Sequence, residues 1–220
     1  MSETRAAVPA VASDKARNRV LLAGIGLSSF SALLLELALT RLFSVVLFYH
    51  FAFLAISIAL LGLGAGGVFA YLGKRRLMRF ETRQLMAGLS AANALLVPCV
   101  LEVVLRIPVS LELSRQNFLR LTAMYLVSAI PFFVTGLEFS IVFARESAHI
   151  PRLYGADLTG GALACLGIVP LLNFLGGPNT ILFAGAVAAA AGARISDASA
   201  CRRRGRSKVR AARRAAPCRP

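Results

Sequence analysis

Residues 20–73 read VLLAGIGLSSFSALLLELALTRLFSVVLFYHFAFLAISIALLGLGAGGVFAYLG, and this apolar stretch determines what kind of protein the chain can form. Its 54 residues contain two charged side chains, Glu36 and Arg41. A single helix of this length would measure about 81 Å, whereas the hydrocarbon core of a bilayer is about 30 Å thick. The stretch therefore predicts two membrane-spanning helices, near Val20–Thr40 and His50–Gly73, with a turn around Arg41–Tyr49.

Most of the remaining chain has the same apolar character. Hydrophobic residues make up 57% and charged residues 16% of the sequence, against about 25% charged residues in soluble domains. Three further apolar runs are long enough to cross a bilayer, near Leu85–Leu105, Leu119–Ala144 and Asp157–Leu175. The predicted fold class is an all-α, polytopic bundle of transmembrane helices. Pro131 removes a backbone hydrogen bond inside the fourth span, so we expect a kink there.

A turn signal divides the last apolar run. Gly176-Gly177-Pro178-Asn179 ends the fifth span, and a sixth span is expected to begin near Asn179. Fifteen residues run from Asn179 to Ala193 before Arg194 interrupts the run. They would form about 22 Å of helix, which is short for a full crossing.

The basic residues predict the orientation of the chain. With six spans, 21 of the 25 Lys and Arg residues fall in segments on one side of the membrane and four on the other. The positive-inside rule places the richer side, including Lys74–Arg83 and both termini, in the cytoplasm. Residues 1–19 then form a cytoplasmic segment, 20–193 a transmembrane domain and 194–220 a basic, disordered tail. Because the surplus of charge follows this topology pattern, nucleic acid is not an expected partner.

Ionisable side chains inside the spans are the candidates for a functional site, because charge in hydrocarbon is costly. The candidates are Glu36, Arg41, His50, Glu138 and Asp157. They predict either a polar site or proton path, or residues that pair and fix helix packing. The second reading is favoured, since the chain lacks the repeated halves typical of many transporters. We expect Glu138 and Asp157, near the inner face, to accept hydrogen bonds from a neighbouring helix or a loop arginine.

Glycines in the second span have two readings. Gly62-Leu63-Gly64-Ala65-Gly66-Gly67 fits the dinucleotide pattern G-x-G-x-x-G, but that pattern requires a strand and a parallel sheet. Gly62 and Gly66 also form GxxxG, which allows two membrane helices to approach closely. We therefore assign Gly62 and Gly66 to helix packing, without a cofactor, and assign the pair Gly160 and Gly161 to the same role.

No common catalytic or metal-binding motif is present in the sequence, which contains no GxSxG, HExxH, P-loop or zinc-ligand spacing. We therefore predict no catalytic residue, metal or cofactor in this chain. The tail CRRRGRSKVRAARRAAPCRP has three readings: a segment that binds RNA or anionic lipid, a solvated disordered tail, or GC-rich DNA read out of frame. The abrupt change of composition after the sixth apolar run favours the third.

Two long segments carry a resemblance to a family. LELALTRLFSVVLFYHFAFLAISIALLGLGAGG resembles the first two helices of spermidine-synthase-like membrane proteins of bacteria. IPFFVTGLEFSIVFARESAHIPRLYGADLTGGALACLGIVPLLNFLGGPN resembles their later helices. The resemblance covers about Leu21 to Gly192 and includes, at matching positions, Glu36, Arg41, His50, Tyr154, Asp157, Gly160 and Gly161.

The resemblance implies a bacterial inner-membrane protein whose membrane domain precedes a cytosolic domain similar to polyamine aminopropyltransferases and S-adenosylmethionine-dependent methyltransferases. Any transfer reaction would belong to that second domain, as a downstream or separate partner, and no catalytic residue of it can be matched here. We therefore expect a truncated membrane domain that is inactive as a transferase. Two alternatives stay open: a small transporter or permease-like protein, and a membrane anchor that recruits a partner through its basic tail.

Overall fold

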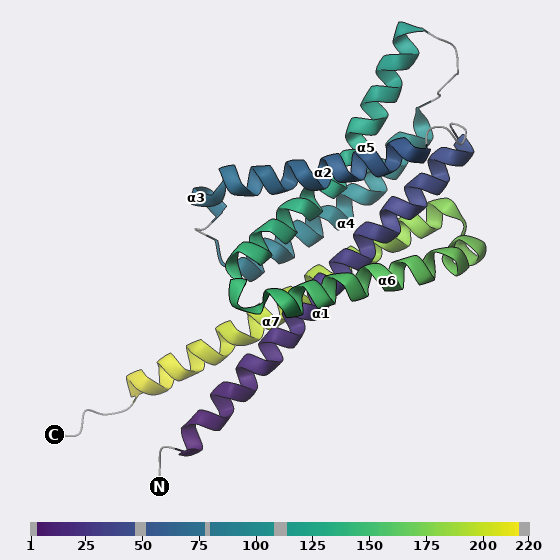
Figure 1. Ribbon diagram of the computed structural model, residues 1–220. Coiled ribbons are helices and arrows are strands. Elements are labelled where there is room, and N and C mark those ends of the chain that lie inside the picture. The colour runs from purple at the N-terminus through teal and green to yellow at the C-terminus, as the bar shows by residue number, and fades with distance from the viewer. Residues whose placement is uncertain (1–3, 47–51, 78–79, 108–113, 216–220) are drawn as a thin grey trace, which may run out of the picture.

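The computed structural model of the protein is a bundle of long helices (Figure 1). It describes residues 4–46, 52–77, 80–107 and 114–215, and this part of the chain contains no strand. The all-α prediction is thereby confirmed. The elements are α1 (Thr4–Val46), α2 (Ala52–Leu72), α3 (Lys74–Leu77), α4 (Thr82–Arg106), α5 (Arg115–Arg145), the 3-10 helix η2 (Ser147–His149), α6 (Ile150–Leu175) and α7 (Gly177–Ala215).

Six of these helices contain a stretch that is long and apolar enough to cross a membrane. The stretches are Asn18–Val45, Phe53–Leu72, Gln84–Arg106, Arg115–Arg145, Ile150–Leu175 and Gly177–Ser196. Large apolar side chains cover the outside of the bundle; Phe53 is 75%, Leu166 76% and Phe174 87% exposed. Apolar surface of this kind is stable in lipid rather than in water, so the chain is a multi-pass membrane protein.

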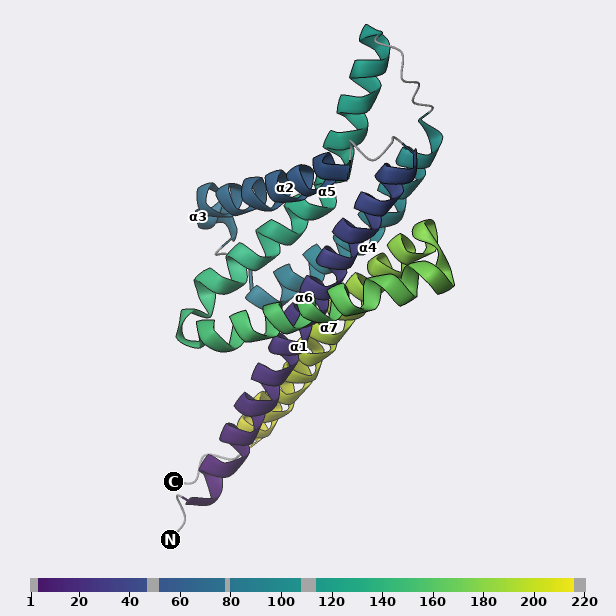
Figure 2. The ribbon, with the colours of Figure 1, turned by 45° about the vertical axis from the view of Figure 1, so that its right-hand side comes forward.

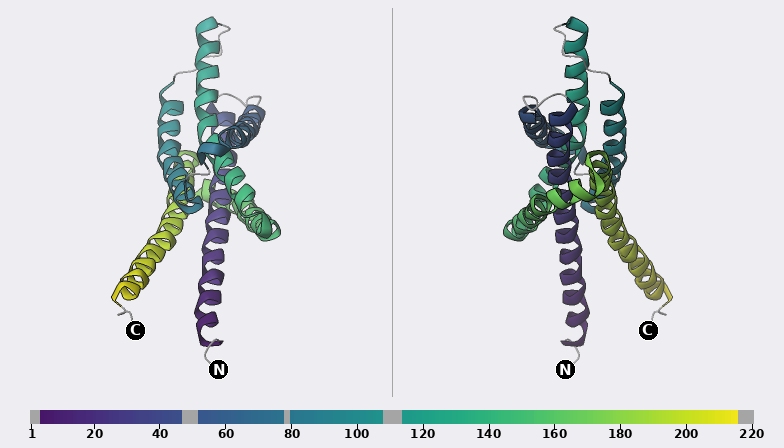
Figure 3. Two further views of the ribbon diagram at one scale, coloured as in Figure 1. Left: turned by 90° about the vertical axis from the view of Figure 1, so that its left-hand side faces the viewer. Right: turned by 90° about the vertical axis from the view of Figure 1, so that its right-hand side faces the viewer.

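Neighbours in space are mostly not neighbours in sequence. Helix α1 packs along α6 and α7, α4 packs between α5 and α7, and α2 packs along α5. The main apolar core includes Leu34, Phe43, Val97 and Phe132, each at most 2% exposed. In both views of Figure 3 the two termini lie at the same end of the bundle, and the ends of α1 and α7 diverge there.

Two predicted helix boundaries are wrong. The turn expected around Arg41–Tyr49 does not begin at Arg41, since α1 continues to Val46; residues 47–51 lie outside the described part. No Gly or Pro interrupts α1 after Arg41, so nothing ends the helix there. Helix α6 begins at Ile150 rather than near Asp157, because Pro151 occupies its first turn, where proline is well tolerated.

The bend and the last turn follow the sequence signals. Figure 2 shows α5 changing direction between its two halves, and Pro131 lies in the middle of this 31-residue helix. Helix α6 ends at Leu175, and Gly176 has φ +79°, a left-handed conformation that favours glycine. The span of α7 starts two residues earlier than expected, at Gly177, and ends three residues later, at Ser196, so it has 20 residues instead of fifteen. At about 30 Å this span is long enough to cross a bilayer.

Helix α7 continues past its span. Its backbone is helical from Arg194 to Ala215. These residues make up most of the segment 194–220, which the sequence predicts to be a basic tail. Ala and Arg are strong helix formers, so a helix that is already nucleated in the membrane extends readily into this sequence. The backbone of α7 thus runs on from the span into the basic segment, and residues 216–220 lie outside the described part.

Candidate functional site

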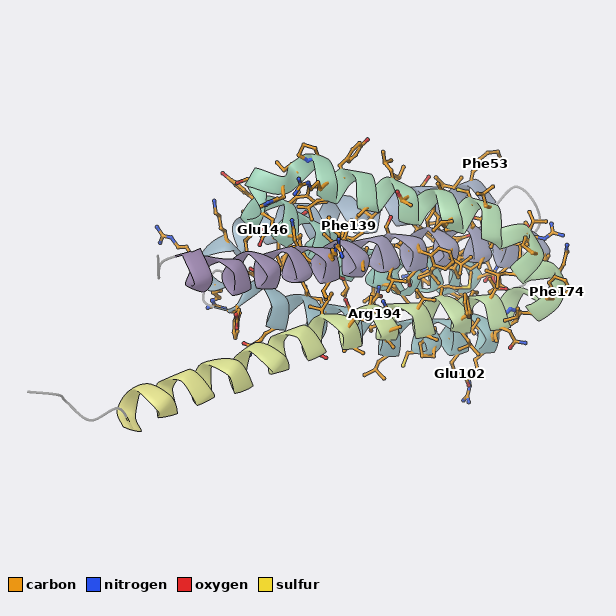
Figure 4. The ribbon with its side chains drawn as sticks, turned by 90° about the horizontal axis from the view of Figure 1, so that it is seen from below. Phe53, Glu102, Phe139, Glu146, Phe174 and Arg194 are labelled. Atoms are coloured by element: carbon orange, nitrogen blue, oxygen red, sulfur yellow. The ribbon has the colours of Figure 1, made fainter. Side chains whose placement is uncertain are left out.

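Helix α5 carries a carboxylate into the interior of the bundle. Glu138 is 1% exposed and lies seven residues before Arg145, where the span ends. Seven residues correspond to about 10 Å of helix, so the carboxylate lies below the membrane surface. Figure 4 shows the adjacent residue, Phe139, between Glu146 near one end of the bundle and Phe53 near the other.

Serines from two other helices donate hydrogen bonds to this carboxylate. The Ser28 hydroxyl of α1 donates to Glu138 Oε1 at 3.1 Å, and the Ser90 hydroxyl of α4 donates to the same oxygen at 2.9 Å. Among the described residues, no Lys, Arg or His forms an ion pair with Glu138. The contacts to the carboxylate therefore come from neutral hydroxyl groups, and they tie α1, α4 and α5 together at one point.

A second polar contact joins α4 and α5 one turn away. The Asn93 amide donates through Nδ2 to the Thr135 hydroxyl at 3.0 Å, and that hydroxyl donates to the carbonyl oxygen of Pro131 at 3.0 Å. The other atom of the amide, Asn93 Oδ1, is buried without a hydrogen-bond partner in the described part of the chain. An unpartnered buried acceptor is costly and is a place for a donor or cation to bind.

Helices α1, α4 and α5 each contribute two buried polar side chains to this region. The two side chains of each pair are three residues apart, which puts both on one helix face. We call these six residues the polar core: Ser28, Ser31, Ser90, Asn93, Thr135 and Glu138. All six are buried, with exposures of 6% or less. Ser31 extends the contacts to a fourth helix, because its hydroxyl donates to the carbonyl oxygen of Ala184 in α7 at 2.7 Å.

The predicted outer-face residues lie away from the polar core. Glu36 is half-buried and Arg41 is exposed, both on α1. Glu36 lies eight residues beyond Ser28, about 12 Å farther along the helix, so it is not part of the same site. Two local hydrogen bonds hold the backbone there, from Thr40 to the Glu36 carbonyl and from Ser44 to the Arg41 carbonyl. His50 lies outside the described residues.

The inner-face carboxylates behave differently from each other. Glu138 is contacted by serines of neighbouring helices rather than by a loop arginine. The Arg145 guanidinium instead donates to the carbonyl oxygens of Leu77 and Phe80 and to the Thr82 hydroxyl. Asp157 is half-buried on α6. Its backbone carbonyl, rather than its carboxylate, accepts the hydrogen bond from the Ser29 hydroxyl, at 2.9 Å.

Gly62 and Gly66 of the second span lie where α2 meets α5. A Cβ at Gly62 would stand 2.7 Å from the carbonyl oxygen of Ala129, and one at Gly66 would collide with the carbonyl oxygen of Phe133. On the other helix, α5, a Cβ at Gly136 would collide with the Leu63 backbone of α2. The two helices run parallel here and approach to backbone contact, which is the role of small residues in membrane helices.

The glycine pair of α6 makes a similar contact with α1. A Cβ at Gly160 would collide with the carbonyl oxygen of Gly26, whereas one at Gly161 would reach Leu33 Cδ2 at an ordinary 3.4 Å. Gly160 thus lies at the point of closest approach and Gly161 beside it. The Ser29 hydrogen bond to the Asp157 carbonyl is part of the same contact between α1 and α6.

Sequence reasoning did not identify the five neutral members of the polar core. A search for charge selects Glu138 and passes over serine, threonine and asparagine. The signal that could have found them is the spacing: Ser28 and Ser31, and Ser90 and Asn93, repeat the three-residue interval of Thr135 and Glu138 within apolar surroundings. Polar side chains on one face of a membrane helix generally point into the bundle.

Comparison with protein-family models, with curated proteins and with solved structures gives no match to this chain. The candidate site therefore rests on the chain's own residues. Its central feature is one buried carboxylate held by hydroxyl groups of two other helices, one helical turn from an amide oxygen that has no hydrogen-bond partner in the described part of the chain.

Proposed function

We propose that this chain is the membrane domain of a spermidine-synthase-like protein of the bacterial inner membrane. The observation that carries the proposal is that the two segments with the family resemblance pack directly on each other. Gly66 from the first segment meets Phe133 from the second, and Gly136 from the second meets Leu63 from the first. Each segment thus has the small residues that the other requires, as parts of one folding unit would.

In this role the chain supplies the membrane-embedded part, and a separate or downstream domain of the S-adenosylmethionine-dependent type carries out any transfer. We expect the purified 220-residue chain to transfer neither an aminopropyl group from decarboxylated S-adenosylmethionine to putrescine nor a methyl group from S-adenosylmethionine. Product formation by the purified chain would contradict the proposal.

The same proposal places both termini in the cytoplasm. Arg75 and Arg115 are exposed in the structure and fall on opposite sides in this orientation. In a variant without native cysteines, a membrane-impermeant maleimide applied to intact cells should label Arg115→Cys and not Arg75→Cys. Arg75→Cys should become reactive when the inner membrane is permeabilised. The reverse pattern would invert the topology and remove the support from the positive-inside rule.

A small transporter is the second candidate function, and the polar core is the observation that favours it. Carboxylates inside membrane bundles mark proton and ion pathways in many pumps and transporters. Glu138 with the free Asn93 Oδ1 nearby would provide oxygen ligands for a proton or a monovalent cation. The side chains that would recruit a partner in the anchor alternative lie beyond residue 196, so that alternative stays a prediction from composition.

Proton flux into proteoliposomes distinguishes the transporter from a purely structural domain. With an internal pH dye and an imposed membrane potential, the wild-type chain should acidify the lumen, and Glu138→Gln should reduce the rate at least tenfold. Glutamine keeps the size and one acceptor oxygen but cannot exchange a proton. Glu102→Gln is the matched control, because its carboxylate is exposed and pairs locally with Arg106. Equal proton flux through the wild-type chain and the Glu138→Gln variant would contradict the transporter function.

A further inference from the structure

A cleft opens between the carboxyl-terminal ends of α2 and α5, and no residue of the polar core lines it. Its volume is about 600 Å³, and it begins beyond the close contact at Gly66. Helix α3 follows directly on α2 (Figure 1), and its residues Lys74 and Leu77 line the cleft. The lining residues are Gly67, Ala70, Tyr71, Lys74, Leu77, Ser140, Ile141, Ala144 and Arg145.

The cleft has an apolar floor and a basic rim. Small and apolar side chains such as Ala70 and Ile141 form the floor, as part of an apolar cluster with Leu137. Lys74 and Arg145 lie at the end where both spans reach the membrane surface, together with the hydroxyl groups of Tyr71 and Ser140. Of the described residues that line the cleft, none is acidic.

The two cations of the rim differ in their freedom. Hydrogen bonds to Leu77, Phe80 and Thr82 hold the Arg145 guanidinium in place, so its charge is fixed at the rim. Lys74 is exposed, and its flexible stem allows the ammonium group to reach a ligand at the membrane surface. At the opening of the cleft, the charge of Arg145 is therefore fixed, whereas the charge of Lys74 can move.

The cleft also faces the lipid. Next to its lining residues on α2, Val68, Phe69 and Leu72 are 60%, 55% and 74% exposed, as expected for side chains in contact with acyl chains. A molecule that fills the cleft would therefore meet hydrocarbon along its length and positive charge at one end. A free phosphate ion would satisfy only the second of these conditions.

We propose that this cleft binds an anionic phospholipid, with the phosphate group between Lys74 and Arg145 and one acyl chain along Ala70, Ile141 and Ala144. Basic pockets between membrane helices are suited to anionic head groups, because charge attraction adds to acyl-chain packing. The lipid would fill the space between the ends of α2 and α5. This inference does not depend on the proposed function.

Native mass spectrometry of the full chain, released from detergent with added lipid, tests the proposal. Phosphatidylglycerol should bind in preference to phosphatidylethanolamine, and inorganic phosphate should not displace it. Lys74→Gln should weaken phosphatidylglycerol binding about fivefold, the effect of one basic residue at an anionic membrane surface. Ala144→Leu should also weaken binding, because it occupies the acyl-chain path without changing any charge.

Arg152→Gln is the matched control, since this arginine is exposed at the start of α6 on the same side of the membrane and outside the cleft. It should leave binding unchanged. Equal losses for Lys74→Gln and Arg152→Gln, with none for Ala144→Leu, would show general surface attraction and overturn the proposal. Displacement by inorganic phosphate at the same concentration as lipid would overturn it in favour of a free-anion site.

Discussion

The Gly66→Leu variant is expected not to form a stable bundle. Its Cβ would collide with the carbonyl oxygen of Phe133 and lie 2.7 Å from the Leu137 nitrogen, and these are backbone atoms that cannot rotate away. Overpacking typically costs about 1–3 kcal/mol and sometimes more. We expect the upper end or beyond, because α2 depends mainly on α5 for its packing. Size-exclusion profiles and thermal unfolding in mild detergent would measure the loss.

Gly64→Leu is the control for this prediction. It adds the same side chain to the same helix, two residues away, but a Cβ at Gly64 meets nothing within 4 Å. It should shift the free energy of unfolding by no more than about 0.5 kcal/mol, as is usual for surface substitutions. If both variants unfold at the same temperature, close packing of α2 on α5 is not what stabilises this part of the bundle.

Removing the Glu138 carboxylate should be the second strongly destabilising change. Glu138→Leu leaves the buried hydroxyl groups of Ser28 and Ser90 without their acceptor. An unsatisfied buried group costs about 1–3 kcal/mol, so two of them should lower the melting temperature clearly. Glu138→Gln should lose less, because an amide oxygen still accepts. Asp157→Leu should have a smaller effect than Glu138→Leu, since the Asp157 side chain is only half-buried.

A triple variant separates the lost hydrogen bonds from other effects of the substitution. Combining Glu138→Leu with Ser28→Ala and Ser90→Ala removes donors and acceptor together. When both partners become apolar, the net change can be close to neutral, so the triple variant should be more stable than Glu138→Leu alone. A triple variant less stable than the single one would mean that the serines contribute to the bundle independently of the carboxylate.

The spans could be predicted from sequence because a helix in hydrocarbon must satisfy its own backbone, so a long uncharged run has few alternatives. The two boundary errors lie beside arginine residues. Arg41 is exposed within α1, and Arg152 is exposed within the first turn of α6. A long arginine side chain can lie along a helix and reach the head groups, so a helix need not end before it.

The site was less accessible to sequence reasoning than the spans. Glu138 could be selected because an ionisable group in hydrocarbon is rare. Its partners could not, because Ser28 and Ser90 lie 110 and 48 residues away and meet it only through the way in which α1 and α4 cross α5. The basic cleft was hidden for the same reason. Lys74 and Arg145 are far apart in the sequence, on α3 and α5, and helix packing brings them to one opening.

The packing order also constrains how the protein is made. Helix α2 is complete at Leu72, but its main partner α5 ends at Arg145, and α1 meets α7 only after most of the chain exists. At about 5–20 residues per second, roughly 4–15 seconds pass between the synthesis of α2 and that of its partner. During this interval the face of α2 that carries Gly62 and Gly66 lacks its main partner. The early helices of such a chain must therefore be stable in the membrane before their partners are made. The hydrogen bond from Ser31 to the Ala184 carbonyl can form only after the last helix, α7, has been synthesised.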